Sequence, residues 1–323
     1  ALYSITMRWL VVVYSLIFMS TSGSAQKWHE PSDTLNKQRA NFLTIGQSCL
    51  WLGSQAGLYM AWYSQYDQEP FHFFNDWPGW MQMDKVGHVA ATYQEGWILY
   101  KMNRWAGMTE KRARNQALIM SYGFQTTFEV MDGFSSGWGF SWYDQAANTV
   151  GSGLFWAQQK AWGEQRIITK FSFWQSGLTN APWFEGSRAR TLYGKSVFEQ
   201  WLKDYNGQTY WLSANVWSLV GKPDRFPKWL NIAVGYSVDN MLGAESNSWD
   251  VITVAGQSIE ELPYTSPLIR QRQYLLSLDI DLSHVDLPPY LTWVKPVFGL
   301  VKFPFPALEI NSHNGLRGHA IYF

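Results

Sequence analysis

The sequence predicts an α+β protein in which an N-terminal four-helix bundle precedes a β-rich C-terminal half, folded as an antiparallel sheet or a partial barrel. Between residues 42 and 162, four segments carry helical hydrophobic spacing or helix start and stop signals, and short loops join them. Beyond Gly163 the hydrophobic period changes to two, which is the period of a half-buried strand. A chain of 323 residues is long enough for two such units.

Composition excludes several classes of function. Lys and Arg number 25 and Asp and Glu number 25, so the chain lacks the basic charge that nucleic-acid binding requires. A single cysteine excludes a disulfide framework and a cysteine-based metal site. Aromatic residues make up 17% of the chain and charged residues only 15%. This balance is typical of an aromatic core or of a surface that meets a membrane interface.

The first residues have the parts of a secretory signal peptide. Met7 and Arg8 precede an apolar run over 9–19, and small residues follow up to Ala25. The run is too short for a membrane anchor, so we expect cleavage after Ala25 and export to the periplasm or outer membrane. The expected organisation is a leader over 1–25, a helical bundle domain over 26–164 and a β-rich domain over 165–323.

The four helices are expected over 42–63, 84–105, 111–131 and 141–162. The first is uncharged but is diluted by Gln, Ser and Gly, which makes it a weak candidate for a transmembrane helix. We expect it to be a buried helix of the bundle. Gly53 and Gly57 would let another helix approach it closely.

The C-terminal half contains two clear strand patterns, over 230–238 and 270–283, in which apolar and polar residues alternate. Weaker strands are expected over 166–174, 209–219, 307–311 and 317–323. One short helix is expected between them, opened by a capping box of Ser196 and Glu199 and stopped by Gly207. The segment 288–306 is apolar and rich in proline, which indicates a packed loop or a kinked helix.

The last strand is amphipathic and ends on the aromatic residue Phe323, with Ile321 on the same face. Such a strand resembles the recognition signal of outer-membrane proteins. A complete membrane barrel needs about eight strands of about ten residues, which is more than this half readily supplies. We therefore expect a smaller sheet that packs on the bundle at the membrane surface.

Polar residues gather at three helix ends that face one end of an up-down bundle. The second helix contributes its start, the third its end and the fourth its start, with members at helical spacing on one face. We call this set the polar cluster. Its members are Asp84, Lys85, His88, Glu129, Asp132, Asp144 and Asn148.

The polar cluster also carries a resemblance to a known family. The relevant motifs are Asp84-Lys85-x-x-His88, Phe128-Glu129-x-x-Asp132-Gly133-Phe134 and Ser141-x-x-Asp144-x-x-x-Asn148-x-x-Gly151. Together they resemble the YfiM-type predicted periplasmic lipoproteins, a family of unknown function whose long Bacteroidota members continue into a β-rich tail. More distantly, the first and last motifs resemble VanZ-like membrane proteins. The resemblance implies a location in the periplasm and a shared set of polar residues, but it implies no reaction. No cysteine stands at the expected cleavage site, so a lipid anchor is not implied.

Three interpretations of the polar cluster remain open. His88 with Glu129, Asp132 and Asp144 offers one imidazole and three carboxylates, a set suited to a divalent metal ion. The histidine beside carboxylates could instead act in acid–base catalysis, although no accompanying catalytic motif is present. In the third interpretation, the charges pair with one another and hold the helices in register.

These observations predict an exported structural or accessory component that associates with the outer membrane, docking on outer-membrane proteins or on lipid. The alternative is a metal-dependent envelope enzyme that acts on lipid or cell-wall material through His88 and the carboxylates. No catalytic residue is assigned, and no nucleic-acid partner is expected.

Overall fold

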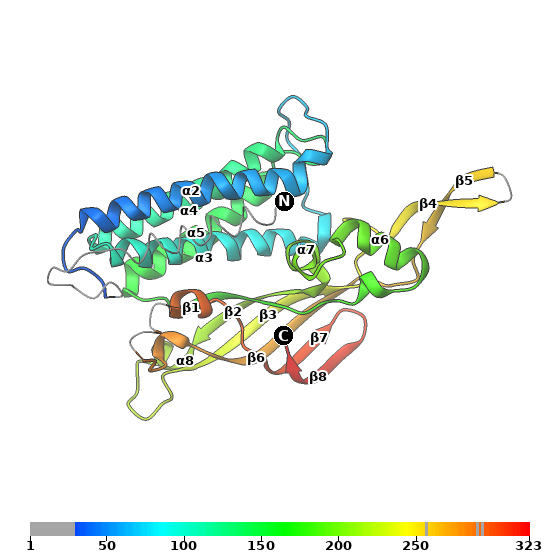
Figure 1. Cartoon of the computed structure of the whole chain (residues 1–323). Helices are drawn as coiled ribbons and strands as arrows, with labels where there is room; N and C mark the ends of the chain where they lie inside the picture. Colours follow the sequence, from blue (N-terminus) through cyan, green and yellow to red (C-terminus); the bar gives the residue numbers. More distant parts are fainter. Residues whose placement is uncertain (1–29, 256–257, 289–290, 292–293) are drawn as a thin grey trace.

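The computed structural model describes residues 30–323 apart from 256–257, 289–290 and 292–293. The predicted signal peptide and its cleavage site after Ala25 lie outside the described residues. The predicted α+β class is confirmed, because long helices form a layer above a six-stranded antiparallel sheet (Figure 1).

All four predicted helices are present, with ends within a few residues of the expected positions. They are α2 (Lys37–Trp62), α3 (Met83–Trp105), α4 (Glu110–Asp132) and α5 (Trp142–Trp162). The side chain of Asn36 caps the start of α2, and that of Ser141 caps the start of α5. Gly163, with a φ of 71°, ends α5 in the left-handed conformation that glycine adopts most easily.

Helix α3 is the centre of the bundle and packs closely against α4 and α5. Its buried Tyr93 and Tyr100 form a core with Phe155 of α5. The close approach of α3 and α5 depends on Gly151, because a Cβ there would lie 2.2 Å from the backbone oxygen of Val89. The glycine in the fourth-helix motif is therefore explained by helix packing.

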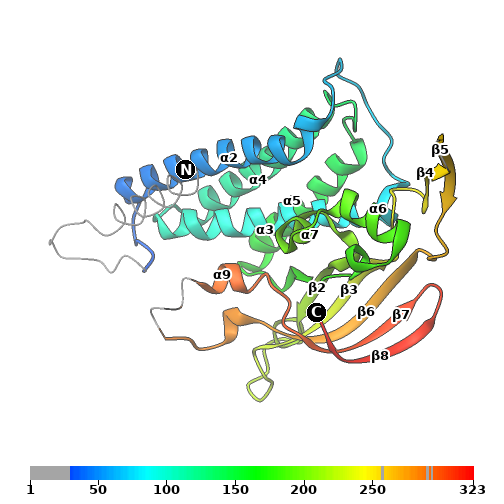
Figure 2. The ribbon, with the colours of Figure 1, turned by 45° about the vertical axis from the view of Figure 1, so that its right-hand side comes forward.

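Helix α2 lies along α4 in both views (Figures 1 and 2), and Trp51 contacts Phe124 edge-on. The expectation that this helix is buried is wrong, because most of its side chains are exposed, Leu50 by 69% and Leu52 by 71%. No described atom lies within 4 Å of a Cβ placed at Gly53 or Gly57, so the small-residue spacing is not used for helix packing here. None of the helices in the described part of the chain combines the length and hydrophobicity needed to cross a membrane.

Two short helices, α6 (Trp183–Tyr193) and α7 (Val197–Lys203), connect the first two strands of the sheet. The sequence predicted only α7. Its capping box of Ser196 and Glu199 is confirmed. The predicted stop at Gly207 is wrong by a few residues, because α7 ends at Lys203 with Asp204 as its C-cap, and Gly207 closes a separate 3-10 turn.

The six predicted strands are all present and pair in the antiparallel order β1-β2-β3-β6-β7-β8. They are β1 (Ile167–Phe173), β2 (Gln208–Asn215), β3 (Leu230–Asp239), β6 (Gln271–Ile280), β7 (Phe305–Asn311) and β8 (Gly315–Tyr322). Strand β2 ends earlier than expected, because Asn215 caps the short helix α8 (Val216–Leu219). Part of the segment 288–306 forms the short helix α9 (Lys295–Phe298). Strands β4 (Ser248–Ala255) and β5 (Ser258–Thr265), which the sequence did not predict, form a separate hairpin that projects away from the sheet (Figure 2).

The two faces of the six-stranded sheet differ in polarity. Cross-strand register places Leu212, Val234, Leu276 and Leu308 in one row on what we call the outer face. Helix α3 lies over part of this face, where its Val86 and Val89 line a cavity together with Leu212, Val234 and Leu276. The opposite, inner face carries buried polar residues. The ends of the first and last strands lie together, since Trp174 stacks on Phe323 with ring centroids 4.6 Å apart.

Candidate functional site

The start of α3 is held by contacts from the sheet. Trp80, Met81 and Gln82 adopt positive φ angles of 49°, 51° and 63° immediately before the helix. Tyr236 of β3 and Arg272 of β6 both donate hydrogen bonds to the backbone oxygen of Met81. This turn directs α3 so that the side chains of its first turns face the start of α5.

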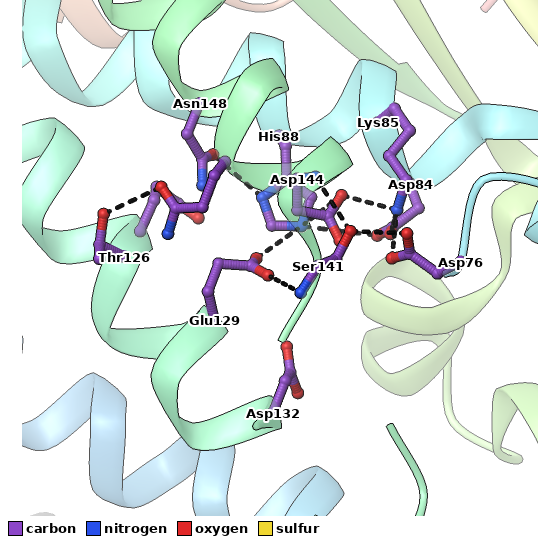
Figure 3. A network of polar contacts seen from close by, with 12 residues as sticks. Asp76, Asp84, Lys85, His88, Thr126, Glu129, Asp132, Ser141, Asp144 and Asn148 are labelled. Carbon is purple, nitrogen blue, oxygen red and sulfur yellow. Dashed lines mark hydrogen bonds and ion pairs between the residues drawn. The ribbon is translucent and has the colours of Figure 1, made fainter. Parts of the chain in front are cut away.

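The predicted convergence of the three helix ends is confirmed for six of the seven residues (Figure 3). Helix α3 supplies Asp84, Lys85 and His88. The remaining three residues, which come from α4 and α5, are Glu129, Asp144 and Asn148. Asp132 points away from this group in Figure 3, and its Oδ1 accepts a hydrogen bond of 2.6 Å from the hydroxyl of Tyr63.

Ser141 ties the ends of α4 and α5 together. Its backbone N–H donates to Oε2 of Glu129 at 3.4 Å, and its hydroxyl accepts from the backbone N–H of Asp144. The same hydroxyl donates to Asp76 at 2.6 Å. The Ser141 cap therefore fixes both the start of α5 and the position of two carboxylates.

Lys85 is the main cation of the site. Its ammonium lies 2.5 Å from Asp76, 2.8 Å from Asp84 and 2.7 Å from Asp144. Burial alone would lower the pKa of Lys85, but the charges of Asp84 and Asp144 raise it above its usual value. Burial would likewise raise the pKa of Asp84, yet His88 and Lys85 lower it to about 2. Lys85 and Asp84 therefore form a stable ion pair at neutral pH.

The other carboxyl groups are not fully compensated. Burial is the main cause that raises the pKa of Glu129 to about 9, with a further contribution from Asp132. Burial and then the charge of Asp84 raise the pKa of Asp144 to about 10. Burial raises the pKa of Asp132 to about 7. Without another cation, the site holds protons on Glu129 and Asp144 at neutral pH, since one lysine cannot balance all of these carboxylates.

His88 lies in the middle of the carboxylates. Its Nδ1 is 3.0 Å from Oδ1 of Asn148, which also accepts from the hydroxyl of Thr92 at 2.9 Å. Its Nε2 is 3.7 Å from Asp84 Oδ1 and 3.6 Å from oxygens of Glu129 and Asp144. These distances are too long for good hydrogen bonds. The side chains of Asp84, His88 and Asp144 offer ligand atoms that all lie within 4.8 Å of one another, so this group could hold a metal ion.

Sequence reasoning missed two residues of the site. Asp76 lies in the loop before α3, where nothing in the local pattern indicated a contact with Lys85. Tyr205 lies in the β-rich half and donates a hydrogen bond of 3.0 Å to Asp84. No local sequence pattern could indicate the contact of Tyr205, because 121 residues separate it from Asp84 and only the tertiary structure brings them together.

A comparison with known protein families gives a match over the region that contains this site. Residues 73–158 match the family described as "Predicted periplasmic lipoprotein (DUF2279)". The match extends from before α3 into α5 and contains every member of the polar cluster. No curated protein and no solved structure matches the chain significantly. The match therefore agrees with the resemblance to predicted periplasmic lipoproteins and assigns no reaction.

Proposed function

We propose that this chain is a structural or accessory component of the cell envelope that docks on the lipid of the outer membrane through the outer face of its sheet. The observation that carries the proposal is the inverted polarity of the sheet. Apolar side chains on the outer face are exposed, Leu276 by 48%, Leu308 by 53% and Ile310 by 61%. On the inner face Lys170 and Asp279 are fully buried. In a sheet that contacts water on one face, the opposite arrangement is expected.

The exposed residues of the outer face form a continuous band. The register pairs Leu276 with Val234 on one side and with Leu308 on the other, and further rows lie above and below. We call the exposed aliphatic residues of these rows the apolar band. They are Leu212, Ile232, Val234, Leu276, Leu278, Leu308 and Ile310. A contiguous apolar surface of this kind marks a site of membrane or protein contact.

The chemistry of the apolar band favours lipid over a protein partner. Protein interfaces form about one hydrogen bond per 100–200 Å² of buried surface, and the side chains of the band offer none. The band extends about 13 Å along the strand direction, from the row in which Ile310 pairs with Tyr274 to the row of Leu278, four residues farther along β6 at about 3.3 Å per residue. One leaflet contributes about 15 Å of the roughly 30 Å hydrocarbon core, so the band matches one leaflet.

Two arguments support the outer membrane as the membrane on which the apolar band docks. Proteins of that membrane contact lipid through strands whose apolar residues point outward and whose polar residues point inward, as they do in this sheet. The family match indicates that relatives of the region 73–158 are predicted to be periplasmic.

Vesicle flotation with the purified protein tests the proposal. We expect the wild type to float with protein-free vesicles of phosphatidylethanolamine and phosphatidylglycerol, and Leu308→Asp to remain in the dense fraction. Ile119→Asp is the matched control, since Ile119 is 71% exposed on α4, away from the sheet. It should float as the wild type does.

Two results would contradict the proposal. The first is a wild type that stays in the dense fraction with protein-free vesicles but sediments with native outer membranes, which would show that a protein is the docking partner. The second is flotation of Leu308→Asp at the wild-type level.

A further inference from the structure

We propose that the polar cluster binds one divalent first-row metal ion through Nε2 of His88 and through carboxylate oxygens of Asp84, Glu129 and Asp144. This site is independent of the lipid-docking face, because it joins α3, α4 and α5 at the end of the bundle.

The first argument is the spacing of the ligand atoms. Three carboxylate oxygens lie 3.6 to 3.7 Å from Nε2 of His88. Neighbouring ligands of an ion with bonds of about 2.1 Å are about 3.0–3.4 Å apart in tetrahedral or octahedral geometry. The oxygens are therefore too far from Nε2 for hydrogen bonds. The ligand atoms of Asp84, His88 and Asp144 already lie within 4.8 Å of one another, and Oε1 of Glu129, 3.6 Å from Nε2, would move inward to join them around a shared ion.

The second argument is an unsatisfied oxygen. Glu129 is 0% exposed, and its Oε1 makes no hydrogen bond with any described residue. This oxygen points toward His88, as Figure 3 shows. A buried carboxylate oxygen without a donor is costly, and coordination of a cation would remove that cost.

The third argument concerns the orientation of the imidazole. With the Asn148 amide placed as in the structure, Oδ1 of Asn148 accepts the proton of His88 Nδ1. The lone pair of Nε2 then faces three carboxyl oxygens. In the metal-free site, protons on Glu129 and Asp144, whose pKa values burial raises, relieve the repulsion, and a metal ion between these groups would take the place of those protons. A metal-bound histidine commonly donates its other N–H to a carbonyl or carboxylate in this way.

Lys85 shares one carboxylate oxygen with the proposed ion, Oδ1 of Asp144, and contacts Asp84 through the other oxygen, Oδ2. It forms no ion pair with Glu129 among the described residues. Oδ1 of Asp84 and Oε1 of Glu129 remain directed toward His88.

The donor set indicates the class of ion. One imidazole with three carboxylates suits Zn²⁺ or Mn²⁺, whereas Ca²⁺ prefers a shell of about six to eight oxygens. Asp132, which the sequence placed among the ligands, is not part of this set because its Oδ1 is bound to Tyr63. Since the ligands come from three helices, the ion would stabilise their packing.

Calorimetric titration of the EDTA-treated full-length protein with ZnCl₂ and MnCl₂ tests this site. We expect one ion per chain for at least one of the two metals. The melting temperature should rise by about 5 °C when the ion is present at about 100 times its dissociation constant. Glu129→Gln and His88→Gln should weaken binding by at least about tenfold. The matched control, Asp132→Asn, removes a half-buried carboxylate outside the proposed set and should bind as the wild type does.

Absence of saturable binding of both metals to the wild type would overturn the proposal and leave Lys85 as the cation that organises the cluster. Equal weakening in Asp132→Asn and Glu129→Gln would overturn the ligand assignment. Because a variant could fail to fold, the wild type labelled with ¹⁵N-histidine provides a second test. If Zn²⁺ binds in the calorimetric titration, one equivalent should shift the ring signals of a single histidine. A shift of several histidines, or of none, would contradict the site.

Discussion

The ammonium of Lys170 lies 2.7 Å from the carboxylate of Asp279, and both side chains are fully excluded from solvent on the inner face of the sheet. Oδ2 of Asp279 also accepts a hydrogen bond of 2.6 Å from Ser213, and Nζ of Lys170 donates to the backbone oxygen of Ile280 at 2.7 Å. The pair links β1 to β6 across two intervening strands. The inner face therefore combines a buried ion pair with the buried apolar cluster of Trp211, Ala233, Leu275 and Ala307.

Removing one partner of this pair should be strongly destabilising. We expect Lys170→Met to lower the free energy of unfolding by about 3 kcal/mol, because it leaves the Asp279 carboxylate buried without its closest cation. The double variant Lys170→Met/Asp279→Leu should recover a large part of that loss. Urea denaturation monitored by circular dichroism measures both effects.

An exposed ion pair provides the control for this experiment. Lys222 lies 2.9 Å from Glu164, with side chains 42% and 28% exposed. Lys222→Met should change the free energy of unfolding by less than about 1 kcal/mol. Equal effects of Lys170→Met and Lys222→Met would show that burial of the inner pair has no energetic consequence.

The close contact between α3 and α5 should make Gly151 intolerant of a side chain. Gly151→Ala places a Cβ about 2.2 Å from the backbone oxygen of Val89, so the helices must separate. We expect a loss of about 2–3 kcal/mol in the free energy of unfolding. Gly153→Ala lies on the same helix with no atom within 4 Å, and it should stabilise by about 0.5–1 kcal/mol through helix propensity. Thermal denaturation of the two variants compares them directly, and similar melting temperatures would refute this account of the motif.

The polar cluster should make the metal-free protein less stable as the pH rises. The pKa of Glu129 is about 9 and that of Asp144 about 10 in the folded state, both raised chiefly by burial. In the unfolded chain the corresponding values are about 4. Between these limits the folded state keeps protons that the unfolded state has lost, so the free energy of unfolding falls with increasing pH.

Denaturation at pH 5, 6.5 and 8 in the presence of EDTA measures this dependence. The charged and titratable groups around Glu129 and Asp144 that influence this dependence are Lys85, His88, Asp84 and the other carboxyl groups of the polar cluster. Asp84 should not contribute in this range, because its pKa of about 2 keeps it ionised in both states. Glu129→Gln should reduce the slope. A stability that increases from pH 5 to pH 8 would contradict the pKa directions.

Local signals predicted most of the secondary structure. The cap at Ser141 and the stop at Gly163 mark α5, and the capping box of Ser196 and Glu199 marks α7, because these side chains act on backbone groups a few residues away. Period-two alternation located β3 and β6, where every second residue meets a different environment. The hairpin of β4 and β5 was not predicted, because its alternation of apolar and polar residues is weaker. Within the described chain these two strands pair only with each other.

The exposure of α2 shows what periodicity cannot decide. An uncharged helix with residues such as Leu50 and Leu52 is compatible with burial in a bundle, in a membrane or at an interface. The tertiary structure packs only one side of α2 on the bundle and leaves both leucines exposed. Hydrophobic spacing reports which residues avoid water and does not report what covers them.

For the candidate site, the sequence by itself determined that polar residues of three helix ends converge, because antiparallel helices joined by short loops bring those ends together. Only the tertiary structure decided how the charges are matched. It places Asp76 and Tyr205 beside Asp84 and Lys85, turns Asp132 toward Tyr63 and leaves Oε1 of Glu129 facing His88. Helical spacing fixes the face on which a side chain lies, whereas its partner depends on segments that packing brings in from distant parts of the chain.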